Sequence, residues 1–377
     1  MTALPIYLDH MSTTPVDPRV ADVMLSTLKS LPGNPSAHTH IYGWQANKAV
    51  EEAREQVAKL LSADTRSIVW TSGATEANNL AIKGAVAQYA RKGKHLVTTA
   101  FEHPAVLACF QYLATQGFDV TTLNPDRKGM INPAQVSDAV REDTILVSVM
   151  HANNEIGTVQ PIANIAEVLK GKGVIFHVDA AQSFGKIPID VDEMGVDLLT
   201  ASGHKCDGPK GVGMLYVRQK PRLRLQPQMH GGKQEQGLRS GTLPTHQIVG
   251  FGQASVLAMQ EMNEESQRLL SWRNQLWDCL SDLPNVHMNG CREYHLPGHL
   301  HFTVANKDAE MLMKAMPELA LSTASACQQE ASEPSYVLSS IGLSAKQALS
   351  SLRLAFGRFT TQSEFDQVQS ILKRALS

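Results

Sequence analysis

The stretch VIFHVDAAQSFGKIPIDVDEMGVDLLTASGHK, residues 174–205, decides the fold of this chain. It contains two short apolar runs, at 174–180 and 197–202, and each run leads into polar residues. Short and nearly continuous apolar runs are typical of strands that are buried on both faces of a sheet. We therefore expect two strands of a mostly parallel sheet here, with polar side chains at their carboxyl ends.

The same pattern extends outward from this stretch. Short apolar runs recur at 67–71, 95–100, 144–150 and 211–217. Amphipathic helical patterns such as 75–93 lie between them. Alternation of strands and helices predicts an α/β fold, with a mostly parallel sheet and helices on both of its sides.

The pattern changes near residue 245, and the length of 377 residues itself suggests two domains. A long helical stretch leads into the apolar run HLHFTVAN (299–306) and further helices, which predicts a smaller α+β domain. The glycine-rich segment 229–244 is the expected boundary loop. We predict a large domain over 16–244 and a small domain formed by 1–15 together with 245–377.

Composition and charge exclude several classes of protein. The chain is 43% hydrophobic and 19% charged, as is typical of globular proteins, and its net charge is -2. Such a balance creates no attraction to nucleic acid or to a membrane surface. No run approaches the roughly 18 apolar residues of a membrane helix, and the N-terminus does not resemble a secretory signal. We therefore expect neither a nucleic-acid partner nor a membrane.

The five cysteines are odd in number and never form a CxxC pair. This argues against a disulfide framework and against a zinc knuckle, and it favours a cytoplasmic location in which thiols stay reduced. The HxH pairs at 38–40 and 299–301 have no further ligands at a matching spacing. We therefore predict no metal site.

Polar residues at the strand ends are the candidates for chemistry, because ligands of parallel sheets bind at that edge. A glycine turn at 72–75 opens a helical pattern, and its free backbone N–H groups suit a phosphate. An ordinary capped helix begins in the same way. Asp179 ends the run 174–180, where it either forms a structural ion pair or lies opposite a ring nitrogen that must stay protonated.

Lys205 follows the next apolar run and lies beside His204. Most lysines are solvated surface charges, but one in this position can have a lowered pKa and can form an imine with an aldehyde. Asp179 and Lys205 end successive strands, and Ser202 and His204 add further donors for a phosphate. Core packing alone does not require this combination.

Several segments of the chain resemble the signature segments of the class V, fold-type I pyridoxal-phosphate enzymes. They are TSGATEANN, FEHPAV, HANNEIGTVQ, HVDAAQ, SGHK followed by GPKG, RSGTLP and STASAC. Among these enzymes the chain is similar to the cysteine desulfurases of the IscS/NifS type. The likeness runs from YLDHMSTTP near residue 7 to GRFTT at 361. It implies a fold-type I transferase whose smaller C-terminal domain carries a catalytic-cysteine loop.

The resemblance assigns roles around the ring of pyridoxal 5'-phosphate. It implies that Lys205 forms an imine with the cofactor and that Asp179 pairs with the pyridine nitrogen. Gln182 would reach the phenolic oxygen of the ring. His103 would stack on the ring and could shuttle protons.

The resemblance also assigns residues to the phosphate and the substrate. The phosphate would be held by Ala74, Thr75, Ser202 and His204. Thr242 would reach the phosphate of a neighbouring subunit, which implies a homodimer. Asn154 would lie against both cofactor and substrate, and Arg353 would grip the substrate carboxylate, for which a guanidinium is well shaped.

Cys327 lies in a stretch of small and polar residues, 322–332, whose composition predicts a mobile loop. Free cysteines are more often buried, but one that takes up sulfur must be exposed and mobile. The resemblance makes Cys327 the nucleophile. The implied reaction converts L-cysteine to L-alanine, with Lys205 or His103 as the base, and leaves a persulfide on Cys327 for a sulfur-acceptor protein.

Two departures from the IscS pattern bear on the acceptor. Residues 328–332 are QQEAS where small hydroxyl residues are more usual, and the chain ends soon after GRFTT, without the tail that engages the iron–sulfur scaffold. Iron–sulfur cluster assembly and thiolation of tRNA or DNA are therefore both open as destinations. The alternatives to a desulfurase are selenocysteine lyase or another class V lyase, and a sulfur-relay scaffold without turnover.

Overall fold

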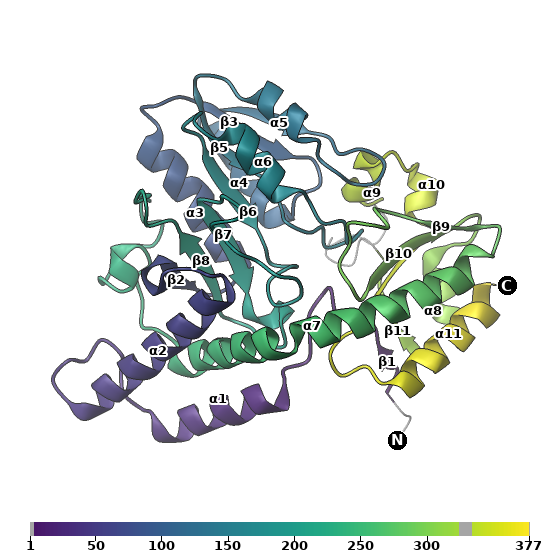
Figure 1. Ribbon diagram of the computed structural model, residues 1–377, viewed down its shortest axis with the longest axis horizontal. Helices are drawn as coiled ribbons and strands as arrows, with labels where there is room; N and C mark the ends of the chain where they lie inside the picture. Colours follow the sequence, from purple (N-terminus) through teal and green to yellow (C-terminus); the bar gives the residue numbers. More distant parts are fainter. Residues whose placement is uncertain (1–3, 324–333, 377) are drawn as a thin grey trace.

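The computed structural model describes residues 4–323 and 334–376. A seven-stranded sheet forms the centre of the larger part of the molecule, in the order β2–β8–β7–β6–β5–β3–β4 (Figure 1). Neighbouring strands run parallel except β8, which is antiparallel to β2 and β7. The strands are β2 (Ile68–Thr71), β3 (His95–Thr99), β4 (Asp119–Leu123), β5 (Thr144–Ser148), β6 (Ile175–Asp179), β7 (Leu198–Ser202) and β8 (Gly213–Val217). The predicted α/β fold with a mostly parallel sheet is confirmed.

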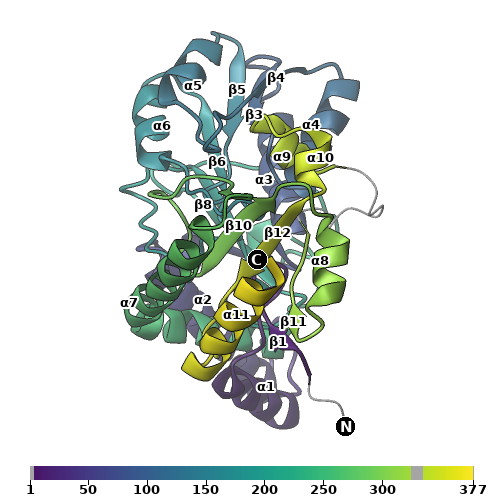
Figure 2. The same ribbon diagram turned by 90° about the vertical axis from the view of Figure 1, so that its right-hand side faces the viewer.

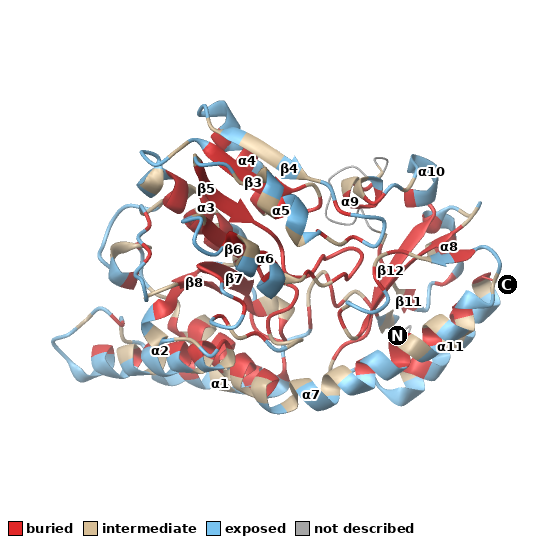
Figure 3. Ribbon diagram, turned by 45° about the horizontal axis from the view of Figure 1, so that its top comes forward, coloured by how far each residue is buried: buried red, intermediate tan, exposed pale blue. Residues whose placement is uncertain are grey.

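Alternate residues of these strands point to opposite faces of the sheet, and helices cover both faces. Ile68 and Trp70 of β2 belong to the core on one face, whereas Val69 belongs to the core on the other. Helices α3 and α4 pack on the face of Val69, and α2, α5 and α6 pack on the opposite face. Figure 3 shows the buried strands between helices that expose one side. The helices are α1 (Pro18–Ser30), α2 (Ile41–Leu60), α3 (Ala74–Tyr89), α4 (Pro104–Thr115), α5 (Pro133–Ala139) and α6 (Ile162–Leu169).

Strand β4 was not among the predicted strands. Its sequence DVTTL is exposed or half-buried throughout, and β4 lies at one edge of the sheet, where among the described residues it pairs with β3 alone. An edge strand needs no continuous apolar run, so its sequence pattern is weak.

The smaller part of the molecule is built on a three-stranded antiparallel sheet in the order β12–β10–β9. This sheet and α11 lie at the end of the molecule that holds the C-terminus (Figures 1 and 2). A short parallel pair, β1 with β11, lies beside them. The elements are β1 (Ile6–Tyr7), β9 (Val286–Met288), β10 (His299–Val304), β11 (Leu319–Ala320), β12 (Ser351–Ala355), α8 (Ala309–Ala315), α9 (Tyr336–Ser340), α10 (Ala345–Ala348) and α11 (Gln362–Leu376).

Helix α7 (Thr245–Ser281) runs along both parts of the molecule (Figure 1). Ile248 and Phe251 in its first half belong to the core beneath the large sheet, whereas Trp272 and Leu276 in its second half belong to the core of the small sheet. The two cores therefore share one helix. The predicted domain boundary at residue 244 stays a prediction.

Within residues 4–323 and 334–376, no helix has the length and apolar character needed to cross a membrane. Over the same residues, no group of three or more metal-ligating side chains comes together.

Candidate active site

The carboxyl ends of β6 and β7 and the start of α3 meet at one cleft of about 550 Å³. Ligand sites at this edge are characteristic of parallel sheets. Nine of the predicted site residues line this cleft: Ala74, Thr75, His103, Asn154, Asp179, Gln182, Ser202, His204 and Lys205. The fold thus brings together residues that are up to 131 positions apart, from Ala74 to Lys205.

Asp179, the last residue of β6, is 4% exposed and held on both carboxylate oxygens. The Asn78 side-chain amide donates to Oδ2 at 2.7 Å, and the backbone N–H of Ala181 donates to Oδ1 at 2.9 Å. Asn78 is itself held, because its Oδ1 accepts a hydrogen bond from Thr200 Oγ1 at 2.7 Å. Hydrogen bonds to both oxygens fix the direction of the carboxylate. Asn78 was not among the predicted site residues.

Lys205 ends the short 3-10 helix Gly203–Lys205 that follows β7. Its amine donates to the backbone carbonyls of Met11 and Ser12, both at 2.7 Å. Beside it, His204 Nδ1 lies 3.2 Å from Thr13 Oγ1. Burial, together with the charge of Lys205 and other lysines, lowers the pKa of His204 to about 4, so this imidazole is neutral at pH 7.

The start of α3 lines the part of the cleft for which the sequence predicted phosphate binding. Gly73 has φ 151°, a conformation that favours glycine, and no side chain caps the helix. The first-turn N–H groups and the helix dipole therefore face the cleft, and among the described residues no side-chain oxygen caps them. Glu76 instead turns back to the N–H of Ser72 at 2.8 Å and forms an ion pair of 2.7 Å with Arg239.

His103 is the N-cap of α4, and its Nδ1 accepts the backbone N–H of Ala105 at 3.1 Å. In the neutral imidazole the proton must then lie on Nε2. Burial lowers the pKa of His103; the nearby charge of Asp179 opposes this shift and that of Lys205 reinforces it. The neutral form with a proton on Nε2 is therefore favoured at pH 7.

Glu102, which precedes His103, is a buried carboxyl that sequence reasoning missed as a member of this region. Its Oε1 accepts from the N–H of Met150 at 2.7 Å and from Thr99 Oγ1 at 3.0 Å. Burial, with a smaller effect from the charge of Asp179, raises its pKa to about 8. Glu102 is thus mostly protonated at neutral pH.

Gln182 and Asn154 lie on other sides of the same cleft. Gln182 Nε2 donates to the carbonyl of Met11 at 2.9 Å, and its Oε1 accepts from the amine of Lys186 at 3.3 Å. Asn154 is 8% exposed, and its Oδ1 has no hydrogen-bond partner among the described residues. A buried amide oxygen of this kind is a ready acceptor for a bound ligand.

Two predicted site residues do not line the cleft, and a third lies outside the described residues. Arg353 on β12 is 2% exposed and bonds Asp9 at 2.8 Å, the carbonyl of Asn154 at 2.8 Å and Ser322 Oγ at 3.1 Å. Thr242 is exposed on the loop before α7. Cys327 lies outside the described residues. The predicted roles of these three residues stay predictions.

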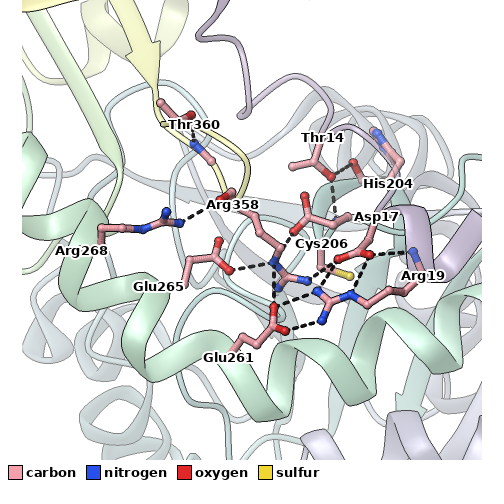
Figure 4. A network of polar contacts seen from close by, with 12 residues as sticks. Thr14, Asp17, Arg19, His204, Cys206, Glu261, Glu265, Arg268, Arg358 and Thr360 are labelled. Atoms are coloured by element: carbon pink, nitrogen blue, oxygen red, sulfur yellow. Dashed lines mark hydrogen bonds and ion pairs between the residues drawn. The ribbon is translucent and has the colours of Figure 1, made fainter. Parts of the chain in front are cut away.

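An ion-pair network lies beside the turn that carries His204 and Cys206 (Figure 4). Arg358 is at its centre, with Nε 2.9 Å from Glu265 and 3.5 Å from Asp207, and Nη1 3.3 Å from Asp17. Burial raises the pKa of Asp207 to about 6, and the charge of Arg358 opposes this rise. The network joins the turn after β12, the helix α7 and the turn that carries Lys205.

Cys206, next to Lys205, is 3% exposed and packs in the core beneath the sheet. Burial raises the pKa of its thiol to about 12. The thiolate is the reactive form of cysteine, so this geometry supports a packing role.

Comparison with known proteins agrees with this geometry. The family model Aminotransferase class-V matches residues 6–368. The cysteine desulfurase IscS of Pectobacterium atrosepticum is 52% identical over 375 residues, which cover 99% of this chain and 93% of that protein. IscS of Aeromonas hydrophila gives the same identity and coverage. These relatives do not favour a selenocysteine lyase or a scaffold without turnover.

Solved structures lead to the same group. A NifS-like protein superposes with a TM-score of 0.92 at 34% identity, covering 99% of both chains. A structure titled "SspA in complex with cysteine" superposes with a TM-score of 0.83 at 38% identity, covering 94% of this chain and 99% of that one. With a family model over nearly its whole length and relatives above 50% identity, this chain belongs to the class V aminotransferase family, as a cysteine desulfurase of the IscS/NifS type, a group of pyridoxal-phosphate enzymes that work in sulfur transfer.

Proposed function

We propose that this chain binds pyridoxal 5'-phosphate in the cleft through Lys205 and removes sulfur from L-cysteine, with Cys327 as the sulfur acceptor. One observation carries the proposal. Asp179 and Lys205, an oriented carboxylate and an amine at the ends of neighbouring strands, line the same cleft as an uncapped helix N-terminus. These are the three groups that a phosphorylated pyridine aldehyde requires.

The residues present fit this cofactor. The start of α3, with Ser202 and His204 nearby, supplies donors for the phosphate, and Asn154 Oδ1 offers a buried acceptor. Asp179 would face the ring nitrogen and Gln182 the phenolic oxygen. When bound, the cofactor supplies an electron sink at its protonated ring, which is the chemistry that the protein itself lacks.

The contacts of His103 favour Lys205 over His103 as the base. Its Nδ1 is occupied by the N–H of Ala105, and Nε2 carries the proton in the neutral ring. Neutral His103 can therefore donate a hydrogen bond at Nε2 but cannot accept a proton there. We assign removal of the substrate Cα proton to the amine of Lys205, and a hydrogen bond from Nε2 to the bound ligand to His103.

The sulfur leaves the substrate by attack of the Cys327 thiolate on its sulfur atom. The C–S bond breaks, an S–S bond forms, and protonation of the remaining carbon gives alanine, so that cysteine and one protein thiol become alanine and one protein persulfide. Arg353 would hold the substrate carboxylate. Its contact with the backbone of Asn154 supports this assignment, because Asn154 lines the cleft.

We also propose a homodimer, a sulfur-acceptor protein and a cytoplasmic location. A homodimer would bring Thr242 of one subunit to the phosphate of the other, and the exposure of Thr242 in the single chain leaves it available for this contact. The persulfide would pass to an acceptor protein of iron–sulfur cluster assembly or nucleic-acid thiolation. The location would be cytoplasmic.

The first experiment tests the cofactor. Wild-type protein incubated with pyridoxal phosphate and then desalted should keep the visible absorption of a lysine-bound cofactor, and Lys205→Ala should lose it. Lys210→Ala is the matched control, because Lys210 also lines the cleft. Equal absorption of Lys205→Ala and wild type would contradict the assignment of Lys205.

The second experiment tests the sulfur acceptor. Mass spectrometry after addition of L-cysteine should find one additional sulfur atom, located on Cys327, together with stoichiometric alanine. The Cys327→Ala variant should show no such adduct. If it still converted cysteine to alanine at the wild-type rate, Cys327 would not be the nucleophile. If only selenocysteine gave alanine, the enzyme would be a selenocysteine lyase.

A further inference from the structure

Lys186 contacts the cleft residue Gln182, which lies four positions before it in the chain. Its amine lies 3.3 Å from Gln182 Oε1 and 4.0 Å from the sulfur of Met11. It lines a small cavity with Cys206, Asp207 and Arg358, and this cavity shares no lining residue with the cleft. The mechanism described above does not use this residue.

The local backbone holds Lys186 in place. Gly185 has φ 73°, and a Cβ there would lie 2.9 Å from Cys206 Cβ, so the turn packs tightly against the residue after Lys205. The carbonyl of Lys186 accepts a hydrogen bond from Ser266 Oγ of α7 at 2.9 Å. The backbone is thus anchored at both sides, and the side chain reaches back one turn to Gln182.

The hydrogen-bonding capacity of the two side chains fixes the direction of the Gln182 amide. A lysine ammonium has three donors and no acceptor, so the oxygen of Gln182 must face Lys186. The NH₂ group must then face the other way, where it donates to the carbonyl of Met11 at 2.9 Å. The same carbonyl accepts from the amine of Lys205 at 2.7 Å.

We infer that Lys186 is a positioning residue that acts through Gln182: it holds the Gln182 amide so that its NH₂ group, and not its oxygen, faces the cofactor oxygen. The inference rests on the proposed cofactor site. Burial lowers the pKa of Lys186 to about 8, while the charge of Asp207 opposes this shift, so the amine is still mostly protonated at pH 7.

A hydrogen-bond donor at the cofactor oxygen would reduce the negative charge on that oxygen. The reduced charge would lower the pKa of the nearby nitrogen that joins the cofactor to Lys205. Loss of this donor should therefore raise the pH midpoint of the cofactor's visible absorption. A hydrogen bond of ordinary strength corresponds to a rise of about one pH unit. The charge of Lys186 acts in the same direction through space, so a single variant cannot separate the two effects.

A double-mutant cycle separates them. The midpoint is measured by absorbance titration in wild type, Lys186→Met, Gln182→Ala and the double variant, each loaded with pyridoxal phosphate. If Lys186 acts through Gln182, each single variant raises the midpoint and the double variant adds little to Gln182→Ala. Lys186→Arg retains a donor and should stay close to wild type.

The matched control is Lys210→Met. Lys210 lines the cleft but has no hydrogen bond to Gln182 among the described residues, so its effect should be the same in both backgrounds. Additive shifts for Lys186→Met and Gln182→Ala, or no shift for Lys186→Met, would overturn the inference. Lys186→Gln gives the same test if the methionine variant does not fold, because its shift must also vanish when Gln182 is alanine. Absence of visible absorption from the loaded wild type would instead reject the proposed cofactor site.

Discussion

Replacement of Arg358 by methionine keeps the length of the side chain and removes its charge and its hydrogen bonds. In the native protein this guanidinium lies within 3.7 Å of four carboxylates, those of Asp17, Asp207, Glu261 and Glu265 (Figure 4). The side chains of Asp17 and Asp207 are only 1% and 8% exposed. The variant would therefore leave the buried carboxylates of Asp17 and Asp207 without the guanidinium that they share.

The structure sets the size of the expected effect. Removal of one partner of a buried ion pair destabilises proteins by about 3–5 kcal/mol. Asp17 keeps a second partner, since Arg19 Nη2 lies 2.7 Å from it, and Asp207 can take up a proton because its pKa is already about 6. We therefore expect a loss near the lower end, about 3 kcal/mol at pH 7.

Urea denaturation followed by circular dichroism measures this loss. The matched control is Arg66→Met, because Arg66 also forms a close ion pair, 2.7 Å from Asp64, but its side chain is 72% exposed. The control should unfold at nearly the wild-type urea concentration. The loss in Arg358→Met should be smaller at pH 5 than at pH 8, because protonation of Asp207 removes part of the uncompensated charge. A loss below about 1 kcal/mol, or one that does not change with pH, would refute the reasoning.

Three further outcomes follow from buried titratable groups. The pKa of Glu102 is about 8 in the folded state, so wild type loses stability as the pH rises from 5 to 8, because the unfolded chain releases this proton more readily. Glu102→Gln has no such proton and should gain stability relative to wild type over this range, as measured by urea denaturation. A stability difference that does not change with pH would contradict this. Burial lowers the pKa of His301 to about 3, so the stability that the neutral imidazole contributes is fully present above pH 6.5, the pKa in the unfolded chain, and is lost as the pH falls below it. Between pH 7 and 5, His301→Asn should therefore lose about 2 kcal/mol less stability than wild type. An equal loss in both proteins would argue against a buried neutral imidazole. Burial raises the pKa values of the Cys109 and Cys206 thiols to about 11 and 12, so both should resist alkylation in the native protein and react after unfolding. Intact-mass measurements at timed intervals follow the labelling, and rapid labelling of either thiol in the native protein would contradict the packing role.

Much of the candidate site could be predicted because the strands of a parallel sheet end at one edge. Asp179 and Lys205 follow apolar runs in the sequence, and Ala74 and Thr75 begin a helix directly after a strand. Once the runs are recognised as neighbouring strands, these residues must lie close together. The finer roles of the same residues came from resemblance to a family.

The partners of these residues could not be predicted in the same way. Asn78 reaches Asp179 across 101 positions of sequence, and this contact depends on how α3 is rotated above the sheet. The protonation of Glu102 depends on burial from all sides, which no local pattern reports. The contact of Lys186 with Gln182 has helical spacing, but it lies in a turn that the apolar pattern does not define.

Helix α7 has a consequence for how the molecule can unfold. Its 37 residues extend over about 55 Å, and its two halves complete two different hydrophobic cores. Cleavage of the chain in the middle of α7 would separate the two halves of the helix, each of which packs in one core. Neither fragment would then fold on its own. Loss of either core would fray the helix that the other needs, and for this reason the chain should melt as one cooperative unit in spite of its two sheets.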